Sequence, residues 1–123
     1  MKKSILILED EAVTRLLLSY YLSEDYDLSI YENGLEGLAW LENGYKADLI
    51  ITDLEMPTMD GFEFVKQVRN DGRFRYTQIL VTSSLDEKEA KEKITCHCTY
   101  LHKSAQFSSL QSCVSRMLNE AQT

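Results

Sequence analysis

Residues 48–61 read Asp48-Leu49-Ile50-Ile51-Thr52-Asp53-Leu54-Glu55-Met56-Pro57-Thr58-Met59-Asp60-Gly61. This stretch opens with a short aliphatic run at residues 49–51, which has the length and composition of a strand buried on both faces. Asp53 ends the run, and Asp60 with Glu63 has the spacing of a capping box that begins a helix. The stretch therefore predicts a buried strand, a loop and a helix, with an acidic side chain at the carboxyl end of the strand.

Four further strands are predicted on the two sides of this stretch. Residues 5–8 and 79–81 are aliphatic runs of the same kind. Residues 26–31 alternate apolar and polar side chains, as a half-buried strand does, and residues 100–101 form a short fifth strand. The chain therefore contains five predicted strands, separated by segments long enough to hold a helix.

An amphipathic stretch follows each predicted strand. The apolar residues at helical spacing are Val13, Leu16, Leu17 and Tyr20, then Leu35, Leu38 and Leu41, then Phe62, Val65 and Val68, and finally Phe107, Leu110, Val114, Met117 and Leu118, while residues 86–94 form a polar helix. A strand–helix unit repeated five times predicts an α/β fold, with a doubly wound parallel sheet and helices on both faces. We expect residues 1–123 to form one domain.

Length, charge and hydropathy exclude several classes of protein. A chain of 123 residues with 44% hydrophobic residues has the size of one domain with a real core. Its net charge of −7 opposes binding to nucleic acid or to an anionic membrane. The first apolar run is too short for a signal peptide. No run approaches the ~20 apolar residues of a membrane span. Three cysteines do not make a disulfide framework. We expect a cytoplasmic protein that binds neither nucleic acid nor membrane.

Polar side chains collect where the predicted strands end. Glu9 and Asp10 follow the first strand, Asp53 ends the third, Ser83 ends the fourth and Lys103 follows the fifth. In an open parallel sheet, ligands bind outside the carboxyl ends of the strands, so we expect these side chains to converge. A single acid at a strand end is often only a helix cap, but the joint arrangement indicates a functional site.

The residue types at this edge indicate phosphoryl chemistry. Carboxylates about 4–5 Å apart repel by roughly 3–4 kcal/mol at an effective dielectric constant of about 20. A divalent cation relieves that repulsion, and Mg²⁺ prefers a few carboxylates together with water and phosphate oxygens. Lys103 supplies a mobile positive charge for a phosphoryl group, and Ser83 supplies one hydrogen bond. Asp53 is then available as a nucleophile toward phosphorus.

These motifs resemble the receiver domain of two-component response regulators, and the resemblance covers essentially the whole chain. The residues that carry it are 5–11, the stretch 48–61, Ser83 with Ser84, and residues 100–103. The resemblance is to a single-domain receiver of the chemotaxis type. It implies the flavodoxin-like strand order 2-1-3-4-5 for the sheet.

The resemblance implies a role for each polar residue at the strand ends. Asp53 matches the phosphoacceptor, and Asp10 matches a direct Mg²⁺ ligand. Glu9 is expected to act on the cation through water, and the backbone carbonyl of Glu55 completes the protein's share of the coordination. Lys103 is expected to contact a phosphoryl oxygen. The family has intrinsic phosphotransfer and self-dephosphorylation activity, and it serves signalling rather than metabolism.

The resemblance also implies a switch and a set of partners. Ser83 matches the switch hydroxyl, although Thr82 is adjacent, and Tyr100 matches the switch aromatic residue. Phosphorylation by a sensor histidine kinase or a phosphotransfer protein would repack the face made by the fourth helix, fifth strand and fifth helix. That face would bind a downstream effector protein or form a phosphorylation-dependent dimer.

One departure from the family pattern keeps other functions open. Ser104 stands where the family usually has proline after the lysine. This departure motivates the alternative of a pseudo-receiver, a scaffold that works without phosphorylation. A phosphatase with an aspartyl nucleophile would need a second aspartate two residues after the first, where this chain has Glu55. We expect His97 and His102 to be bystanders.

Overall fold

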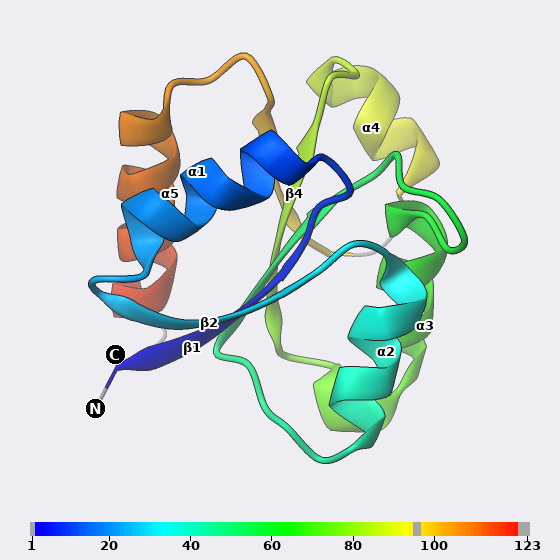
Figure 1. Ribbon diagram of the computed structural model, residues 1–123. Coiled ribbons are helices and arrows are strands. Elements are labelled where there is room, and N and C mark those ends of the chain that lie inside the picture. The colour runs from blue at the N-terminus through cyan, green and yellow to red at the C-terminus, as the bar shows by residue number, and fades with distance from the viewer. Residues whose placement is uncertain (1, 95–96, 121–123) are drawn as a thin grey trace.

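The computed structural model describes residues 2–94 and 97–120. Within these residues it has five parallel strands: β1 (Lys3–Leu8), β2 (Tyr26–Tyr31), β3 (Leu49–Asp53), β4 (Gln78–Ser83) and β5 (Thr99–His102). They form one sheet in the order β2-β1-β3-β4-β5 (Figure 1). The predicted fold class and the predicted strand order are both confirmed.

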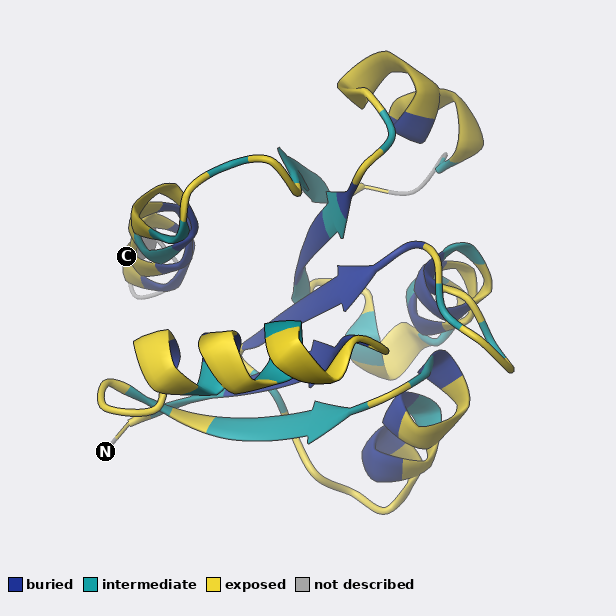
Figure 2. Cartoon of the chain, turned by 45° about the horizontal axis from the view of Figure 1, so that its top comes forward, coloured by how far each residue is buried: buried dark blue, intermediate teal, exposed yellow. Residues whose placement is uncertain are grey.

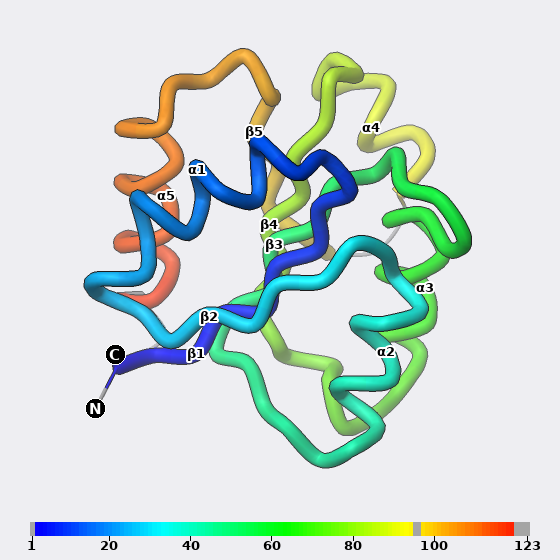
Figure 3. Tube along the Cα trace, viewed as in Figure 1, coloured from blue at the N-terminus to red at the C-terminus, as the bar shows by residue number. Residues whose placement is uncertain are grey.

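Helices cover both faces of this sheet. They are α1 (Ala12–Leu22), α2 (Gly34–Glu42), α3 (Gly61–Asn70), α4 (Glu87–Lys93) and α5 (Phe107–Glu120), with a short 3₁₀ turn, Gly72–Phe74, after α3. The pair α1 and α5 packs on one face, and α2, α3 and α4 pack on the other (Figure 3). None of the helices in the described part of the chain combines the length and apolar character that a membrane-spanning segment needs.

The central strands β1, β3 and β4 separate two hydrophobic cores. In β1, for example, Ile5 and Ile7 face α1 and α5, whereas Leu6 and Leu8 face α2 and α3. Figure 2 shows the central strands as largely buried and the edge strands β2 and β5 as mostly intermediate. Because most of the central strands is apolar and covered on both faces, polar side chains reach the surface mainly at the strand ends.

Helix α1 presents a different face to solvent from the one that its periodicity suggested. The repeat that predicted the helix includes Leu16 and Tyr20, but their exposed fractions are 71% and 77%. The α1 side chains in the core are instead Leu18 and Leu22. The helix itself is confirmed, and its outer face is an apolar surface that the sheet does not cover.

Local hydrogen bonds explain where three of the helices begin. The side chains of Asn33, Asp60 and Asp86 accept hydrogen bonds from backbone N–H groups three residues later, at 2.9, 3.0 and 2.8 Å. The predicted helix start at Asp60 is therefore confirmed. Helix α2 ends at Glu42, and Gly44 lies just beyond it with a φ of 93° that favours glycine.

Candidate functional site

Three carboxylates meet at the edge where the strands end. Glu9 and Asp10 follow β1, and Asp53 is the last residue of β3. Each can place an oxygen within 4.8 Å of the other two. Glu9 and Asp53 are 3% and 4% exposed, whereas Asp10 faces solvent. The predicted convergence of these acids is thus present, with two of them buried and one open to ligands.

Lys103 reaches into this acidic cluster from the end of β5. Its Nζ lies 2.7 Å from Asp53 Oδ2 and 3.3 Å from Glu9 Oε1. The backbone N–H of Lys103 donates to the carbonyl of Ser83 at 2.8 Å, which fixes the base of the side chain against β4. The lysine therefore bridges two buried carboxylates, although Ser104 follows it in place of proline.

Burial and charge shift the pKa values of two groups in the cluster. Burial raises the pKa of the Glu9 carboxyl, the N–H of Glu11 lowers it, and the negative charge of Asp53 raises it again, with a net increase. Burial lowers the pKa of the Lys103 ammonium, but hydrogen bonding and attraction to Asp53 and Glu9 outweigh that effect and raise it. Excess negative charge is thus concentrated here, and the Lys103 ammonium offsets part of it.

The donor set fits a hard divalent cation such as Mg²⁺. Glu9, Asp10 and Asp53 offer oxygen atoms only, within the span of a single ion's coordination sphere. Two of the acids are held at strand ends by the sheet, so the site is largely formed before a cation arrives. The backbone N–H of Glu55 donates to Asp53 Oδ1 at 3.3 Å, which orients the Asp53 carboxylate. The carbonyl of Glu55 as a further ligand stays a prediction.

The structure places Ser83 and Thr82 in different surroundings. Ser83 is fully buried, and its Oγ accepts a hydrogen bond from the N–H of Leu85 at 3.0 Å. Thr82 lines a cavity on the side of α1 and α5. Ser83 therefore ends β4 with its hydroxyl bonded to the loop that leads to α4, and its role as the switch hydroxyl stays a prediction.

Tyr100 lies beside the same loop. Its hydroxyl donates to the carbonyl of Leu85, and it lies 3.3 Å from the carbonyl of Ser83. Burial raises the pKa of the Tyr100 hydroxyl, and the negative charges of Asp86 and neighbouring α4 acids add to the increase. The hydroxyl thus remains a hydrogen-bond donor that ties β5 to the loop between β4 and α4.

Comparison with known proteins identifies this arrangement. The family model described as "Response regulator receiver domain" matches residues 5–115. The chain belongs to this family. It is a receiver domain of two-component response regulators, and its phosphoacceptor role at the level of the family follows from that membership.

Relatives and solved structures agree with this assignment. The receiver is 35% identical over 83 residues to the sensor histidine kinase CheAY of Helicobacter pylori, and 34% identical over 100 residues to the chemotaxis protein CheV3 of the same species. These matches take in 65% and 72% of the chain but only 10% and 32% of the two relatives. Among solved structures, Vibrio cholerae CheY4 gives a TM-score of 0.84 at 28% identity, covering 95% of this chain and 99% of that one. The signal receiver domain of a Syntrophus aciditrophicus histidine kinase gives 0.87 at 27% identity, covering 96% and 91%.

Arg15 supports the receiver's acidic cluster, and the sequence motifs did not indicate it. Its Nη1 donates to the backbone carbonyls of Glu9 and Asp10 at 3.0 and 2.8 Å, and its Nη2 lies 3.4 Å from Glu32 Oε1. The guanidinium therefore holds the loop between β1 and α1 in one conformation. The only sequence signal was its place 5 residues after Asp10, near the start of a predicted helix, which is too common to single out a residue.

Gly61 leaves less room for a Cβ than any other glycine of the receiver. A Cβ at this position would lie 2.0 Å from the Asp53 carbonyl oxygen and 2.8 Å from Leu54 Cα. Gly61→Ala must therefore displace either β3 or α3, and we expect it to lower the free energy of unfolding by about 2–3 kcal/mol, measured by urea titration. Gly72→Ala is the matched control, because nothing lies within 4 Å of a Cβ there. Equal free energies of unfolding for the two variants would contradict the close approach of residue 61 to the Asp53 carbonyl oxygen.

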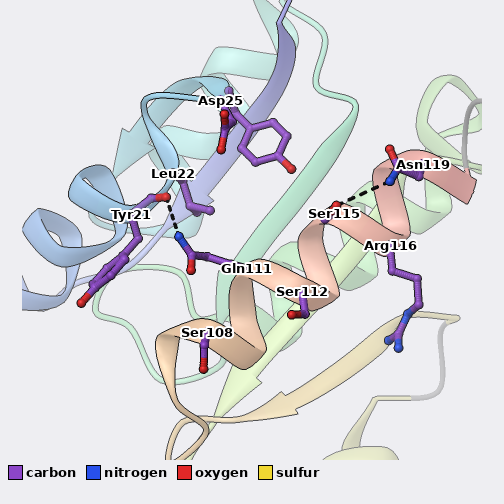
Figure 4. A pocket seen from close by; sticks show the side chains of 10 residues that line it. Tyr21, Leu22, Asp25, Ser108, Gln111, Ser112, Ser115, Arg116 and Asn119 are labelled. Atoms are coloured by element: carbon purple, nitrogen blue, oxygen red, sulfur yellow. Dashed lines mark hydrogen bonds between the residues drawn. The ribbon is translucent and has the colours of Figure 1, made fainter.

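A broad groove elsewhere on the receiver takes no part in this site. It has a volume of about 780 Å³ and runs between the end of α1 and the outer face of α5. Figure 4 shows its polar lining, in which Gln111 donates to the carbonyl of Tyr21 at 3.0 Å and Asn119 contacts Ser115. None of the predicted site residues lines it.

Proposed function

We propose that this receiver accepts a phosphoryl group on Asp53 from the phosphohistidine of a sensor histidine kinase or of a phosphotransfer protein. One observation carries the proposal. The Asp53 carboxylate is buried at the end of β3, lies among the oxygens of Glu9 and Asp10, and accepts a hydrogen bond from Lys103. A carboxylate in that setting is suited to nucleophilic attack on phosphorus. Residues 1–123 act as one receiver domain in this proposal.

The transfer breaks one bond and forms another. An Asp53 carboxylate oxygen attacks phosphorus, a P–O bond forms, and the P–N bond to the donor imidazole breaks with its electron pair leaving on nitrogen. Self-dephosphorylation follows when water attacks the acyl phosphate and inorganic phosphate leaves. Asp53 is thereby regenerated, so the receiver has the chemistry of a signalling phosphoacceptor rather than of a metabolic enzyme.

The surrounding residues have distinct roles in this reaction. Asp10, Asp53 and the backbone carbonyl of Glu55 would hold Mg²⁺, with Glu9 acting through water, and the bound cation would neutralise charge on the phosphoryl oxygens. Lys103 is paired with Asp53 before the reaction. Once Asp53 is phosphorylated, the Lys103 ammonium forms its ion pair with a negatively charged phosphoryl oxygen instead. These roles place all the strongly charged groups of the site around one phosphorus atom.

Ser83 and Tyr100 couple the phosphoryl group to the face made by α4, β5 and α5. The Ser83 hydroxyl turns toward the phosphoryl group and releases the N–H of Leu85, and Tyr100 then repacks against the altered loop. The packing of α4 supports such movement, because Ala90 is the one α4 residue that is buried. Binding of an effector or formation of a dimer on this face is the proposed output.

The outer face of α1 supports docking of the phosphohistidine donor. Val13, Leu16 and Tyr20 are exposed on a helix that begins directly after the acidic loop. A cavity of about 290 Å³ beside it is lined by Leu17 and Phe107 and reaches the site residues Glu9 and Lys103. A protein that covers this apolar face brings its histidine to the edge of the sheet where Asp53 lies.

The experiment uses phosphoramidate, a small donor with the same P–N bond as phosphohistidine. We expect intact-protein mass spectrometry to find one phosphoryl group on the wild type with Mg²⁺, and none on Asp53→Asn. Beryllofluoride with Mg²⁺ should also stabilise the wild type alone. At a 100-fold excess over the dissociation constant, the gain is about 2.7 kcal/mol, or on the order of 10 °C in melting temperature.

Three outcomes decide between the proposal and other assignments. Mg²⁺-dependent labelling that disappears in Asp53→Asn supports the phosphoacceptor. Absence of both labelling and beryllofluoride stabilisation in the wild type would overturn it in favour of a scaffold that works without phosphorylation. Labelling that persists in Asp53→Asn would assign the acceptor to another residue.

A further inference from the structure

His102 forms hydrogen bonds on both sides of its ring, next to the site lysine. Nε2 lies 3.0 Å from the carbonyl oxygen of Ser84, which follows β4. Nδ1 accepts from the backbone N–H of Ser104 at 3.0 Å and lies 2.7 Å from the Ser104 hydroxyl. The imidazole therefore connects the loop after β4 to the residue that follows Lys103.

The two backbone partners define the tautomer of this imidazole. A carbonyl oxygen only accepts, so Nε2 must carry a proton to bond with Ser84. A backbone N–H only donates, so Nδ1 must be unprotonated to bond with Ser104. Nδ1 has a single lone pair, which the amide and the hydroxyl of Ser104 share. Both contacts thus require the neutral ring with its proton on Nε2.

The bonded segment is the turn that carries the site lysine. The N–H of Ala105 donates to the carbonyl of His102 at 2.9 Å, which closes a four-residue turn with Lys103 and Ser104 in its centre. A proline at position 104 would restrict this turn through its ring but would have no N–H to donate. Serine has that N–H, and His102 accepts it, so hydrogen bonds here replace a covalent restriction.

We propose that His102 is a positioning residue that fixes Lys103 relative to Ser83 and Asp53. This inference rests on the proposed phosphoacceptor function, in which Lys103 must reach a phosphoryl oxygen on Asp53. The backbone N–H of Lys103 bonds to Ser83, and the His102 ring bonds the residues next to each of them, Ser84 and Ser104. The two loops that hold the lysine and the switch hydroxyl therefore move as one unit.

The first test examines the tautomer and the bond to Ser104 without any phosphoryl group. In ¹H–¹⁵N spectra of the wild type, we expect the His102 ring as a single tautomer with its proton on Nε2. Hydrogen exchange at the Ser104 amide should accelerate by about tenfold or more in His102→Gln, which lacks an acceptor at the Nδ1 position. It should stay near wild type in His102→Asn, whose amide oxygen stands where Nδ1 stands. A ring protonated on Nδ1, or equal Ser104 exchange in all three proteins, would overturn the proposal.

The second test measures the rate of labelling by phosphoramidate with Mg²⁺. His102→Leu keeps a side chain of similar size on β5 but loses both hydrogen bonds, and we expect its rate to fall about tenfold. His102→Asn keeps the acceptor for Ser104, and His102→Gln keeps a donor for Ser84, so each should recover part of the rate. If His102 acted through packing alone, neither polar variant would be labelled faster than His102→Leu.

The outcomes distinguish this inference from the function on which it rests. If the wild type takes up no phosphoryl group, the proposed function is overturned and the positioning role fails with it. The tautomer and exchange data then still decide whether His102 connects Ser84 to Ser104. A wild type that is labelled at the same rate as His102→Leu overturns the positioning role alone. Graded rates, with leucine lowest and both polar variants between leucine and histidine, support it.

Discussion

Lys103→Met should lower the free energy of unfolding measured without Mg²⁺ by about 2 kcal/mol. The substitution leaves Glu9 and Asp53 buried and close together, with no cation to offset their charges. Removing one partner of a buried ion pair costs about 3–5 kcal/mol, and we take a smaller value because the lysine side chain is 33% exposed. Urea titration at neutral pH measures the change.

Mg²⁺ should restore most of the stability that Lys103→Met loses, because the cation takes over the neutralising role of the ammonium. The variant should also lose most of its stabilisation by beryllofluoride, since no ammonium contacts the phosphoryl mimic. The matched control is Lys91→Met, which removes the same charge from an exposed pair with Glu87. We expect the control to change stability by less than about 0.5 kcal/mol. Equal losses in the two variants would show that Lys103 is not paired with the buried acids.

The order of strands and helices could be predicted from sequence because apolar residues recur at different spacings in the two kinds of element. Short aliphatic runs such as residues 49–51 are too short for helices and too apolar for loops, so they are assigned without ambiguity. The outer face of α1 could not be predicted in this way. Large apolar side chains occur on both sides of that helix, and periodicity does not say whether Leu16 or Leu18 meets the sheet. The path of the chain between β1 and α1 decides it.

The acids of the site could be predicted, whereas the residues that support them could not. Glu9, Asp10 and Asp53 each stand at the end of an apolar run, and a parallel sheet brings such ends together. Arg15 and His102 act instead through backbone carbonyls and amides of neighbouring loops. Those partners carry no residue-type signal, because every residue has a carbonyl. His102, predicted to be a bystander, thus proved to have partners on both ring nitrogens.

Asp53→Asn should abolish phosphorylation and, without Mg²⁺, raise the free energy of unfolding by about 1–2 kcal/mol. Asparagine keeps the size of the side chain but removes one of three carboxylates that lie within 4.8 Å of one another. Two charges at that separation repel by roughly 3–4 kcal/mol at an effective dielectric constant of about 20. The lost ion pair with Lys103 offsets part of this gain, but Lys103 retains Glu9 at 3.3 Å.

The pH dependence of this stabilisation has a definite sign. The pKa of Glu9 is raised in the folded state, by burial first and in part by the charge of Asp53, so the folded protein keeps this proton to higher pH than the unfolded chain does. The contribution of Glu9 to stability is therefore complete below its unfolded pKa and is lost as the pH rises through its folded pKa. Asp53→Asn removes one cause of that loss, so its advantage over wild type should be small in acid and largest near neutral pH.

Thermal unfolding of the two proteins in Mg²⁺-free buffers, one acidic and one neutral, measures this difference. Asp27→Asn, which removes an exposed acid from β2, is the matched control and should stay within about 0.5 kcal/mol of wild type at both pH values. A metal-free melting temperature of Asp53→Asn below that of wild type at neutral pH would mean that the bond to Lys103 outweighs the repulsion among the acids. The same repulsion that Asp53→Asn relieves is what a cation relieves in the wild type, so Mg²⁺ should stabilise the wild type more than the variant.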